Sequence, residues 1–203
     1  GSGAPLDTDH FDDRYDHIFC WHEQDQAQVG AYRVCRGQPA GAGSPTYLNS
    51  MFAFDGHFFP DEGAALELGR SFITPQYQRS RYALDLLWRG IGSYLKAHPD
   101  IRRLYGTVSL TRQNDPVSTQ MICDALISPS GQTRPRYALT TPLPPEWSRF
   151  NAEHDVDLAM LNTLIAAREH DGKGVPVLLR HYLGLGAIFH AVGIAPQFAD
   201  TPG

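Results

Sequence analysis

The sequence predicts an α/β fold with a mixed central sheet flanked by helices, and three observations predict it. Two strand-like runs near the N-terminus, 17–22 and 27–36, enclose a short polar turn. A further strand-like run, 66–73, is followed directly by an amphipathic helix. Another strand-like run, a series of helix-like runs and a last strand-like run follow, an order that favours a sheet with strands of both directions.

The first two runs, "HIFCWH" and "AQVGAYRVCR", flank "EQDQ" and are expected to form a β-hairpin. The next strand, "LELGRSFI", ends before Pro75, and the following helix is expected to begin near Ser80, a favourable N-cap residue. Apolar residues three or four positions apart predict one core-facing stripe on this helix: Leu84, Leu87, Trp88, Ile91 and Leu95.

The remaining elements follow from the same kind of pattern. "RRLYGTVSL" (102–110) predicts a strand, and Asp115–Pro116 is expected to cap a helix through about Ile127. After a proline-rich, irregular stretch come two helical patterns and a last strand, at 156–169, 176–186 and 187–195. We therefore expect one domain over residues 4–203, with residues 1–3, "GSG", as a cloning remnant.

Composition excludes several classes of function. The formal charge of −5 does not favour non-specific binding to nucleic acid. The nine histidines and three cysteines show no zinc-ligand spacing, so no metal site is expected. An odd number of cysteines without a CxxC pair fits a reduced, cytoplasmic setting. No apolar run approaches the ~20 residues that span a bilayer.

Four charged residues lie in or beside predicted strands. Glu67 and Arg70 in "ELGR" are three residues apart, so a regular strand points them to opposite faces. A bulge at Gly69 would bring both toward one site, whereas the plain alternative is two solvated surface residues. Arg33 lies within an apolar strand and Asp16 precedes another. Buried charges are costly unless paired, and they gather at functional sites.

The turn after the third strand, "PQYQRSR", carries two arginines and no glycine. A helix N-terminus after a strand commonly binds a phosphate, and arginine suits that ligand. We expect an anion site of Arg79, Ser80, Arg81 and Tyr82, with a solvated basic loop as the alternative.

From Asp9 to Phe198 the chain resembles the hemolysin-like branch of the GNAT N-acyltransferases, which includes the bacterial synthases of glycine lipids and ornithine lipids. The motifs that carry the resemblance are "YDHIF", "VGAYRV", "ELGRSFITPQYQRSRYALDLLWRGI", "LYGTVSL" and "VPVLLRHYLGLGA". A looser similarity extends to the acyl-homoserine-lactone synthases, which also carry a Glu-x-x-Arg strand at the acyl site.

The resemblance implies a GNAT-type acyltransferase fold and an enzyme that moves a long-chain, 3-hydroxy acyl group to the α-amine of an amino acid. It implies Glu67 as the base, with Arg70 beside it as the second catalytic residue. Arg33 is expected to pair with Asp16 or with the acceptor's carboxylate. Backbone amides near Phe72 are expected to stabilise the thioester oxygen, and Phe72–Ile73 to pair with the donor's pantetheine arm. The last residue assigned to substrate binding is Ser109.

The resemblance also bears on the donor and on the partners. GNAT enzymes that use coenzyme A usually carry a Gln/Arg-x-x-Gly-x-Gly/Ala turn, and "QYQRSRYA" replaces it here. This turn suits the single phosphate of the phosphopantetheine arm of acyl carrier protein, an acidic partner, and no tightly bound cofactor is expected. Either glycine or ornithine is expected as the acceptor, and contact with the inner face of the membrane is expected to be peripheral. Two alternatives stay open: an acyl-coenzyme A-dependent transferase acting on a small amine, and a non-catalytic module that binds an acyl carrier or a lipid.

Overall fold

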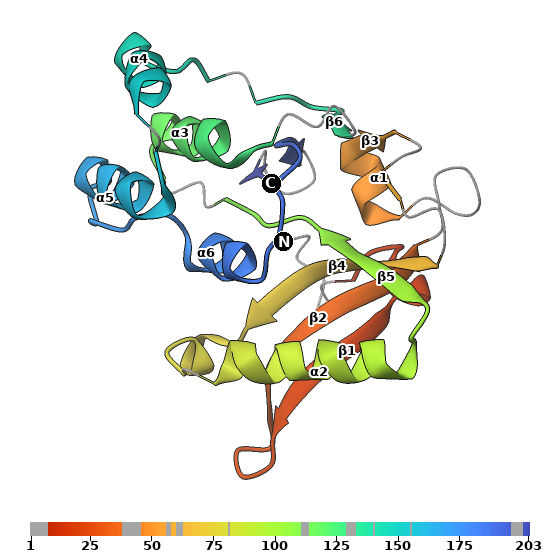
Figure 1. The fold of residues 1–203 in the computed structure, drawn as a ribbon. Helices are drawn as coiled ribbons and strands as arrows, with labels where there is room; N and C mark the ends of the chain where they lie inside the picture. The colour runs from red at the N-terminus through yellow and green to blue at the C-terminus, as the bar shows by residue number, and fades with distance from the viewer. Residues whose placement is uncertain are drawn as a thin grey trace. The chain divides into compact units, whose positions relative to one another are not determined.

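The computed structural model (Figure 1) describes ten stretches of the chain: 8–37, 46–55, 58–59, 63–80, 82–110, 114–128, 133–139, 141–154, 156–195 and 201–203. The chain forms two units, of which the first comprises residues 1–50 and 56–107 and the second residues 51–55 and 108–203. The expectation of one domain over residues 4–203 stays a prediction, and residues 1–3 lie outside the described residues.

A four-stranded sheet in the order β1-β2-β4-β5 forms the centre of the first unit. Its strands are β1 (Asp16–His22), β2 (Ala27–Gly37), β4 (Ala64–Ile73) and β5 (Ile101–Gly106). β1 and β2 form the predicted hairpin, β2 and β4 are also antiparallel, and β4 and β5 are parallel. The prediction of a mixed sheet is therefore confirmed.

The helix α2 (Ala83–Ala97) covers one face of this sheet (Figure 1). Leu87 and Ile91 are buried against strand residues of the core, and Trp88 and Leu95 pack beside them. This confirms the predicted core-facing stripe for these four residues. The N-cap prediction is wrong, because the helix begins at Ala83, after the short 3-10 helix η2 (Pro75–Tyr77) and a turn.

A bulge interrupts the pairing of β2 with β4. Ala31 faces Phe72 whereas Arg33 faces Gly69, so β4 carries one extra residue over this interval. The bulge that the sequence suggested is present, but the residue with left-handed backbone is Arg70 (φ 44°) rather than Gly69. A Cβ at Gly69 would meet no atom within 4 Å, so sterics do not require a glycine there.

β4 and β5 part before β4 ends. Their pairing runs from Ala64 to Leu68, where Leu68 faces Gly106. Among the described residues, no strand pairs with this edge of β4 beyond Leu68. The predicted strand 102–110 is therefore too long at its C-terminal end, because the residues after Gly106 leave the sheet.

The N-terminal segment and a short helix complete the first unit. The 3-10 helix η1 (Asp12–Arg14) precedes β1, and α1 (Tyr47–Met51) follows β2 and ends at the boundary of the second unit. Neither element was predicted, because each is too short to show a periodic pattern.

The second unit is mainly helical. It contains α3 (Pro116–Leu126), α4 (Pro145–Glu153), α5 (Leu158–Arg168) and α6 (Val177–Gly184), with two small sheets formed by β3 (Phe52–Phe54) with β6 (Thr133–Pro135) and β7 (Ile194–Ala195) with β8 (Thr201–Pro202). Asp115 caps α3 as predicted, since its Oδ1 accepts a hydrogen bond from the Val117 amide at 2.8 Å.

One predicted element of this unit is wrong. The apolar run 187–195 was expected to form a strand, but only its last two residues belong to one, β7. Phe189 forms an isolated bridge with Ile127. The proline-rich stretch that was expected to be irregular contains β6 and the start of α4.

Candidate active site

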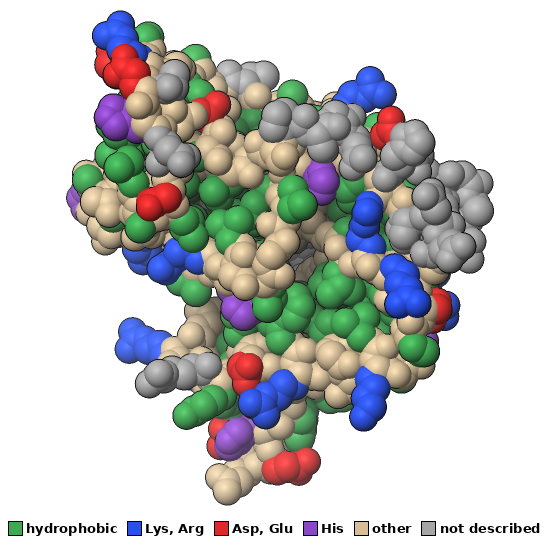
Figure 2. All heavy atoms as spheres, in the orientation of Figure 1, with side chains coloured by type: hydrophobic (Ala, Val, Ile, Leu, Met, Phe, Trp, Pro, Cys, Tyr) green, Lys and Arg blue, Asp and Glu red, His purple; other side chains and the backbone are tan. Residues whose placement is uncertain are grey.

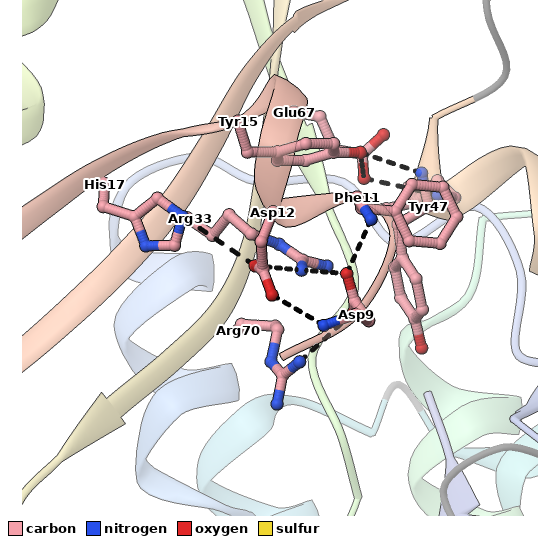
Figure 3. Close-up of polar contacts among 10 residues, drawn as sticks. Asp9, Phe11, Asp12, Tyr15, His17, Arg33, Tyr47, Glu67 and Arg70 are labelled. Atoms are coloured by element: carbon pink, nitrogen blue, oxygen red, sulfur yellow. Dashed lines mark hydrogen bonds and ion pairs between the residues drawn. The ribbon is translucent and has the colours of Figure 1, made fainter. Parts of the chain in front are cut away.

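The most deeply buried arginine of the described residues is a bridge between β2 and the N-terminal segment. Arg33 is 2% exposed, and its Nη1 donates to Asp9 Oδ1 and to Asp12 Oδ1, both at 2.7 Å (Figure 3). A guanidinium removed from water to this degree needs such charge-assisted hydrogen bonds. Arg33 is therefore paired with two carboxylates, that of Asp9 just before η1 and that of Asp12 at the start of η1.

The predicted pairing of Arg33 with Asp16 is wrong. Asp16 faces Val34 across the hairpin, so it lies on the opposite face of the sheet from Arg33, which faces His17. On that face Asp16 accepts a hydrogen bond from the Tyr94 hydroxyl of α2 at 2.8 Å. The alternation of a strand explains the error, because neighbouring positions on β1 point to opposite sides.

Arg70 reaches the same acidic pair from β4. Its Nη1 donates to Asp9 Oδ2 at 3.2 Å, and its side chain is 22% exposed. Arg70 on β4 and Arg33 on β2 thus meet in one cluster around Asp9 (Figure 3). The expectation that the bulge brings Glu67 and Arg70 toward one catalytic site stays a prediction.

The two aspartates are anions in this cluster. Burial raises the pKa of Asp9, but hydrogen bonds from Arg33 and from the Phe11 amide outweigh it, so the pKa lies below its ordinary value. Burial also raises the pKa of Asp12, and hydrogen bonds from the Asp9 amide and from Arg33 bring it below the ordinary value. The same pairing raises the pKa of Arg33 despite burial. Within the cluster, the carboxylates of Asp9 and Asp12 therefore lie against the guanidinium groups of Arg33 and Arg70.

Aromatic rings enclose the Arg33 guanidinium. Its Cζ lies 4.7 Å from the centroid of Tyr15, 5.8 Å from that of Phe11 and 5.9 Å from that of Tyr47. These distances are within the range of cation–π interactions. Arg33 is thus held on several sides by protein groups, which favours a bracing role over direct binding of a substrate.

Glu67 lies on β4 with no exposed surface. Its Oε1 accepts hydrogen bonds from the Tyr15 hydroxyl at 2.9 Å and from the Leu48 amide at 3.3 Å (Figure 3). Its Oε2 is buried and forms no hydrogen bond of normal geometry with the described residues. Burial raises the pKa of Glu67, and hydrogen bonds from Thr46, Tyr15 and Leu48 oppose that rise. The surface alternative for Glu67 is excluded.

Phe72 and Ile73, which were predicted to bind the acyl donor, lie in the part of β4 beyond its pairing with β5. The Thr74 amide donates to Val29 O, and Phe72 faces Ala31, so the backbone groups of Phe72 point toward β2. By alternation the backbone of Ile73 points to the other edge, where its carbonyl accepts a hydrogen bond from Gln78 Nε2 at 3.0 Å. The amide available on this edge is therefore that of Ile73, while the Phe72 side chain is 49% exposed.

The predicted anion site is exposed. Arg79, Ser80 and Tyr82 are exposed, and Arg81 lies outside the described residues. Ser80 Oγ accepts a hydrogen bond from the Tyr82 amide at 3.3 Å in place of capping the helix. On the face drawn in Figure 2, Lys and Arg side chains are separated by hydrophobic and neutral surface. Ser109 is exposed, belongs to the second unit and follows the end of β5.

Three members of the cluster were missed from the sequence: Asp9, Asp12 and Tyr15. All three lie in "DHFDDRYDHIF", and the acidic residues before the first strand were a signal. Within the described part of the chain, no group of three or more His, Cys, Asp or Glu residues could hold a metal ion. No helix among the described residues is long and apolar enough to cross a membrane, and the cytoplasmic location stays a prediction.

Comparisons with known proteins show what this part of the chain is similar to. Residues 1–89, which include every member of the cluster, match the family model described as an acetyltransferase (GNAT) domain. Glycine N(alpha)-acyltransferase of Bacteroides thetaiotaomicron is 27% identical over 98% of this chain and 64% of that protein. The protein of the same name from Phocaeicola vulgatus is 26% identical over 98% of this chain and 66% of its own length.

A third relative, L-ornithine N(alpha)-acyltransferase of Agrobacterium fabrum, is 33% identical over 45% of this chain and 33% of that protein. The chain thus spans about two thirds of the length of the glycine acyltransferases that it matches. A solved integron cassette protein from the mobile metagenome of V. cholerae has a TM-score of 0.30 and 12% identity, over 64% of this chain and 62% of that one, and it carries no inference. The resemblance to the GNAT N-acyltransferases and the α/β fold class are confirmed.

Proposed function

We propose, from the GNAT match of residues 1–89 and the cluster that they contain, that the protein is an N-acyltransferase. It moves a long-chain, 3-hydroxy acyl group from the thioester of acyl carrier protein to the α-amine of an amino acid. The observation that carries the proposal is the buried Glu67 on β4, next to the point where β4 parts from β5. The names of the relatives, glycine and L-ornithine N(alpha)-acyltransferase, support glycine or ornithine as the acceptor.

The donor's arm is extended and carries amide groups, so it can add to a strand edge as a peptide does. β4 offers such an edge from Gly69 to Ile73, where no described strand pairs with it on the β5 side. The Ile73 amide faces this edge and is placed to donate to the arm or to the thioester oxygen as that oxygen gains charge.

The reaction needs a base because an α-ammonium group has no lone pair. Glu67 accepts one proton from the ammonium through a single water, since the buried carboxylate cannot touch the amine directly. The neutral amine then attacks the thioester carbonyl carbon, and the C–N bond forms as the C–S bond breaks. The leaving thiolate takes up a proton, and the nitrogen loses its second proton to give the amide.

The acceptor's carboxylate needs a cation. Arg70 is the better candidate of the two cluster arginines, because it is 22% exposed whereas Arg33 is 2% exposed and already holds two carboxylates. Its planar guanidinium can bind a carboxylate through two parallel hydrogen bonds. Arg33 and the aspartates then fix the position of Arg70.

The donor's phosphate is assigned to the turn before α2, with Arg79, Ser80, Arg81 and Tyr82. Arginine side chains on this turn would also meet the acidic surface of acyl carrier protein. The turn lacks the glycine pattern of a pyrophosphate site, which favours acyl carrier protein over coenzyme A as the donor.

The experiment that tests the proposal offers the purified protein a 3-hydroxyacyl group on acyl carrier protein or on coenzyme A, at equal chain length. Glycine and ornithine are supplied separately, and mass spectrometry detects the N-acyl product. We expect product with one of these amino acids and faster turnover from the carrier protein. Tight binding of the acyl carrier without any product would instead indicate a non-catalytic module.

A further inference from the structure

Tyr15 occupies a position in the cluster that the proposed reaction does not yet use. Its side chain is 6% exposed and lies between Glu67 and the first turn of α1. Its hydroxyl donates to Glu67 Oε1 at 2.9 Å and accepts a hydrogen bond from the Tyr47 amide at 2.8 Å (Figure 3).

The direction of these hydrogen bonds is fixed by chemistry. A backbone N–H can only donate, so the Tyr47 amide makes the Tyr15 oxygen an acceptor and leaves the Tyr15 proton for Glu67. The Leu48 amide also donates to Oε1. Oε1 is thus an acceptor in both of its hydrogen bonds, and a proton that Glu67 takes up must reside on Oε2.

We propose that Tyr15 is a positioning residue for acyl transfer: it holds Glu67 through Oε1 so that Oε2 is the atom that accepts the proton of the amine. The inference rests on the proposed function, because it assigns Glu67 the part of the base. Oε2 is the carboxyl oxygen that forms no hydrogen bond of normal geometry with the described residues, so it is the one left for this task.

Several groups besides Tyr15 influence the charge of Glu67. Against the effect of burial, Thr46, the residue before α1, and Arg33 on β2 both lower the pKa of Glu67. Burial and, in turn, Glu67 raise the pKa of Cys35 on β2 and of Tyr105 on β5, which face Glu67. Burial and the neighbouring Glu67 raise the pKa of Tyr15 far above its ordinary value. Tyr15 therefore keeps its proton and remains a donor throughout the working pH range.

The test compares two changes at Tyr15 that should shift the pKa of Glu67 in opposite directions. Tyr15→Phe removes the donor, and a fluorinated tyrosine introduced at position 15 keeps the ring and strengthens the donor. A hydrogen bond to a carboxylate favours its ionised form, so we expect the pKa of Glu67 to rise by about one to two pH units in Tyr15→Phe. In the fluorinated protein the pKa should fall.

Two readouts follow that pKa. The first is the acid limb of kcat against pH, measured at saturating acceptor, which should move up in Tyr15→Phe and down in the fluorinated protein while KM stays close to the wild-type value. The second is the pH titration of the Glu67 carboxyl carbon signal in carbon-13 NMR, a measurement that needs no turnover. The signal is assigned by its absence in Glu67→Gln. Tyr94→Phe is the matched control, because the Tyr94 hydroxyl also donates to a carboxylate, that of Asp16, at 2.8 Å.

A purely structural role for Tyr15 would lower stability without moving the acid limb. If the wild type turns over but the limb and the NMR titration are the same in both Tyr15 proteins as in Tyr94→Phe, the inference is wrong and the proposed function stands. If the wild type forms no product with either donor, the proposed function is wrong and the inference fails with it. Should Tyr15→Phe not fold, the fluorinated protein still decides between these outcomes, since it keeps both hydrogen bonds.

Discussion

At the scale of single residues, the cluster contains a carboxyl and a guanidinium that are both buried but are held in different ways. Arg33 is surrounded by groups that stabilise its charge, namely two ionised aspartates and three aromatic rings. Glu67 is surrounded mainly by neutral donors, so burial keeps its pKa above the ordinary value. These two environments lead to different predictions.

Arg33→Ala should destabilise the fold by about 3–5 kcal/mol, because it leaves Asp9 and Asp12 close together without their main counter-ion. Arg33→Lys should also be destabilising, since one ammonium cannot reproduce the planar contact of a guanidinium. Chemical unfolding measures both. Arg36→Ala on the same strand is the control, because the Arg36–Asp100 pair is exposed and should contribute at most about 1 kcal/mol. Equal losses in Arg33→Ala and Arg36→Ala would contradict the bracing role.

Glu67→Gln should change how stability depends on pH. The pKa of Glu67 is raised in the folded protein from 4.5, so the folded state binds a proton that the unfolded state releases. The stability due to this group is therefore complete below about pH 4.5 and declines as the pH rises through the higher folded value. Thermal unfolding over a pH series should show that the stability of the variant rises relative to that of the wild type as the pH increases. A constant difference between the two proteins would mean that the pKa of Glu67 is not raised.

At the scale of elements, β4 determines the site, because it pairs with β2 along its length and with β5 only up to Leu68. At the last pair before the two strands separate, the backbone of Gly106 lies close to that of Leu68. A Cβ at position 106 would lie 2.3 Å from the Leu68 carbonyl oxygen. The bulge one residue further on requires no glycine at position 69.

A pair of glycine variants tests this description of β4. Gly106→Ala should destabilise by about 1–3 kcal/mol, since the methyl group displaces the backbone of Leu68. Gly69→Ala should leave stability unchanged or raise it by up to about 1 kcal/mol, because the methyl group meets nothing and the unfolded chain loses freedom. Unfolding in denaturant gives both values. A larger loss of stability in Gly69→Ala than in Gly106→Ala would contradict this description, because it would mean that position 69 is the one that requires glycine.

The turn before α2 gives the prediction for the donor. Arg79→Glu combined with Arg81→Glu should raise KM for the acyl carrier donor and weaken its dependence on salt, because the attraction to an acidic partner is lost. Lys173→Glu combined with Arg180→Glu makes the same change of charge on exposed positions of the second unit and serves as the control. If both double variants behave alike, the turn has no part in docking.

The sequence predicted those elements that depend on residues close together in the chain, and it failed where contacts between distant residues decide the structure. The hairpin and α2 were predicted because their periodicity is local, and the Glu-x-x-Arg strand was assigned to the site through the resemblance. The partners of Arg33 were not predicted, because Asp9 and Asp12 lie in an irregular segment whose position only tertiary structure sets. The strand at 187–195 failed for a related reason, since an apolar run that short does not say whether it will find a partner.

At the scale of the whole molecule, all described members of the cluster belong to the first unit and to the stretch that matches the GNAT domain. The formal charge of −5 gives no general attraction to an acidic carrier, so the preference for that donor must come from local groups. The helical second unit has its own core around Ile122, Leu161 and Ile165. Its part in the activity stays a prediction, because Ser109 is the single assigned residue that lies there.

The proposed activity depends above all on Glu67 acting as the base in the formation of an N-acyl amino acid. The rate of product formation, followed by mass spectrometry, is to be compared between the wild type and Glu67→Gln with the acyl carrier donor and each acceptor. We expect product from the wild type, a kcat lower by about 10²–10⁴-fold in the variant, and partial recovery at high pH, where more of the amine is already neutral. Absence of product from the wild type, or a variant within about twofold of it, would contradict this role of Glu67, since a general base contributes far more than that.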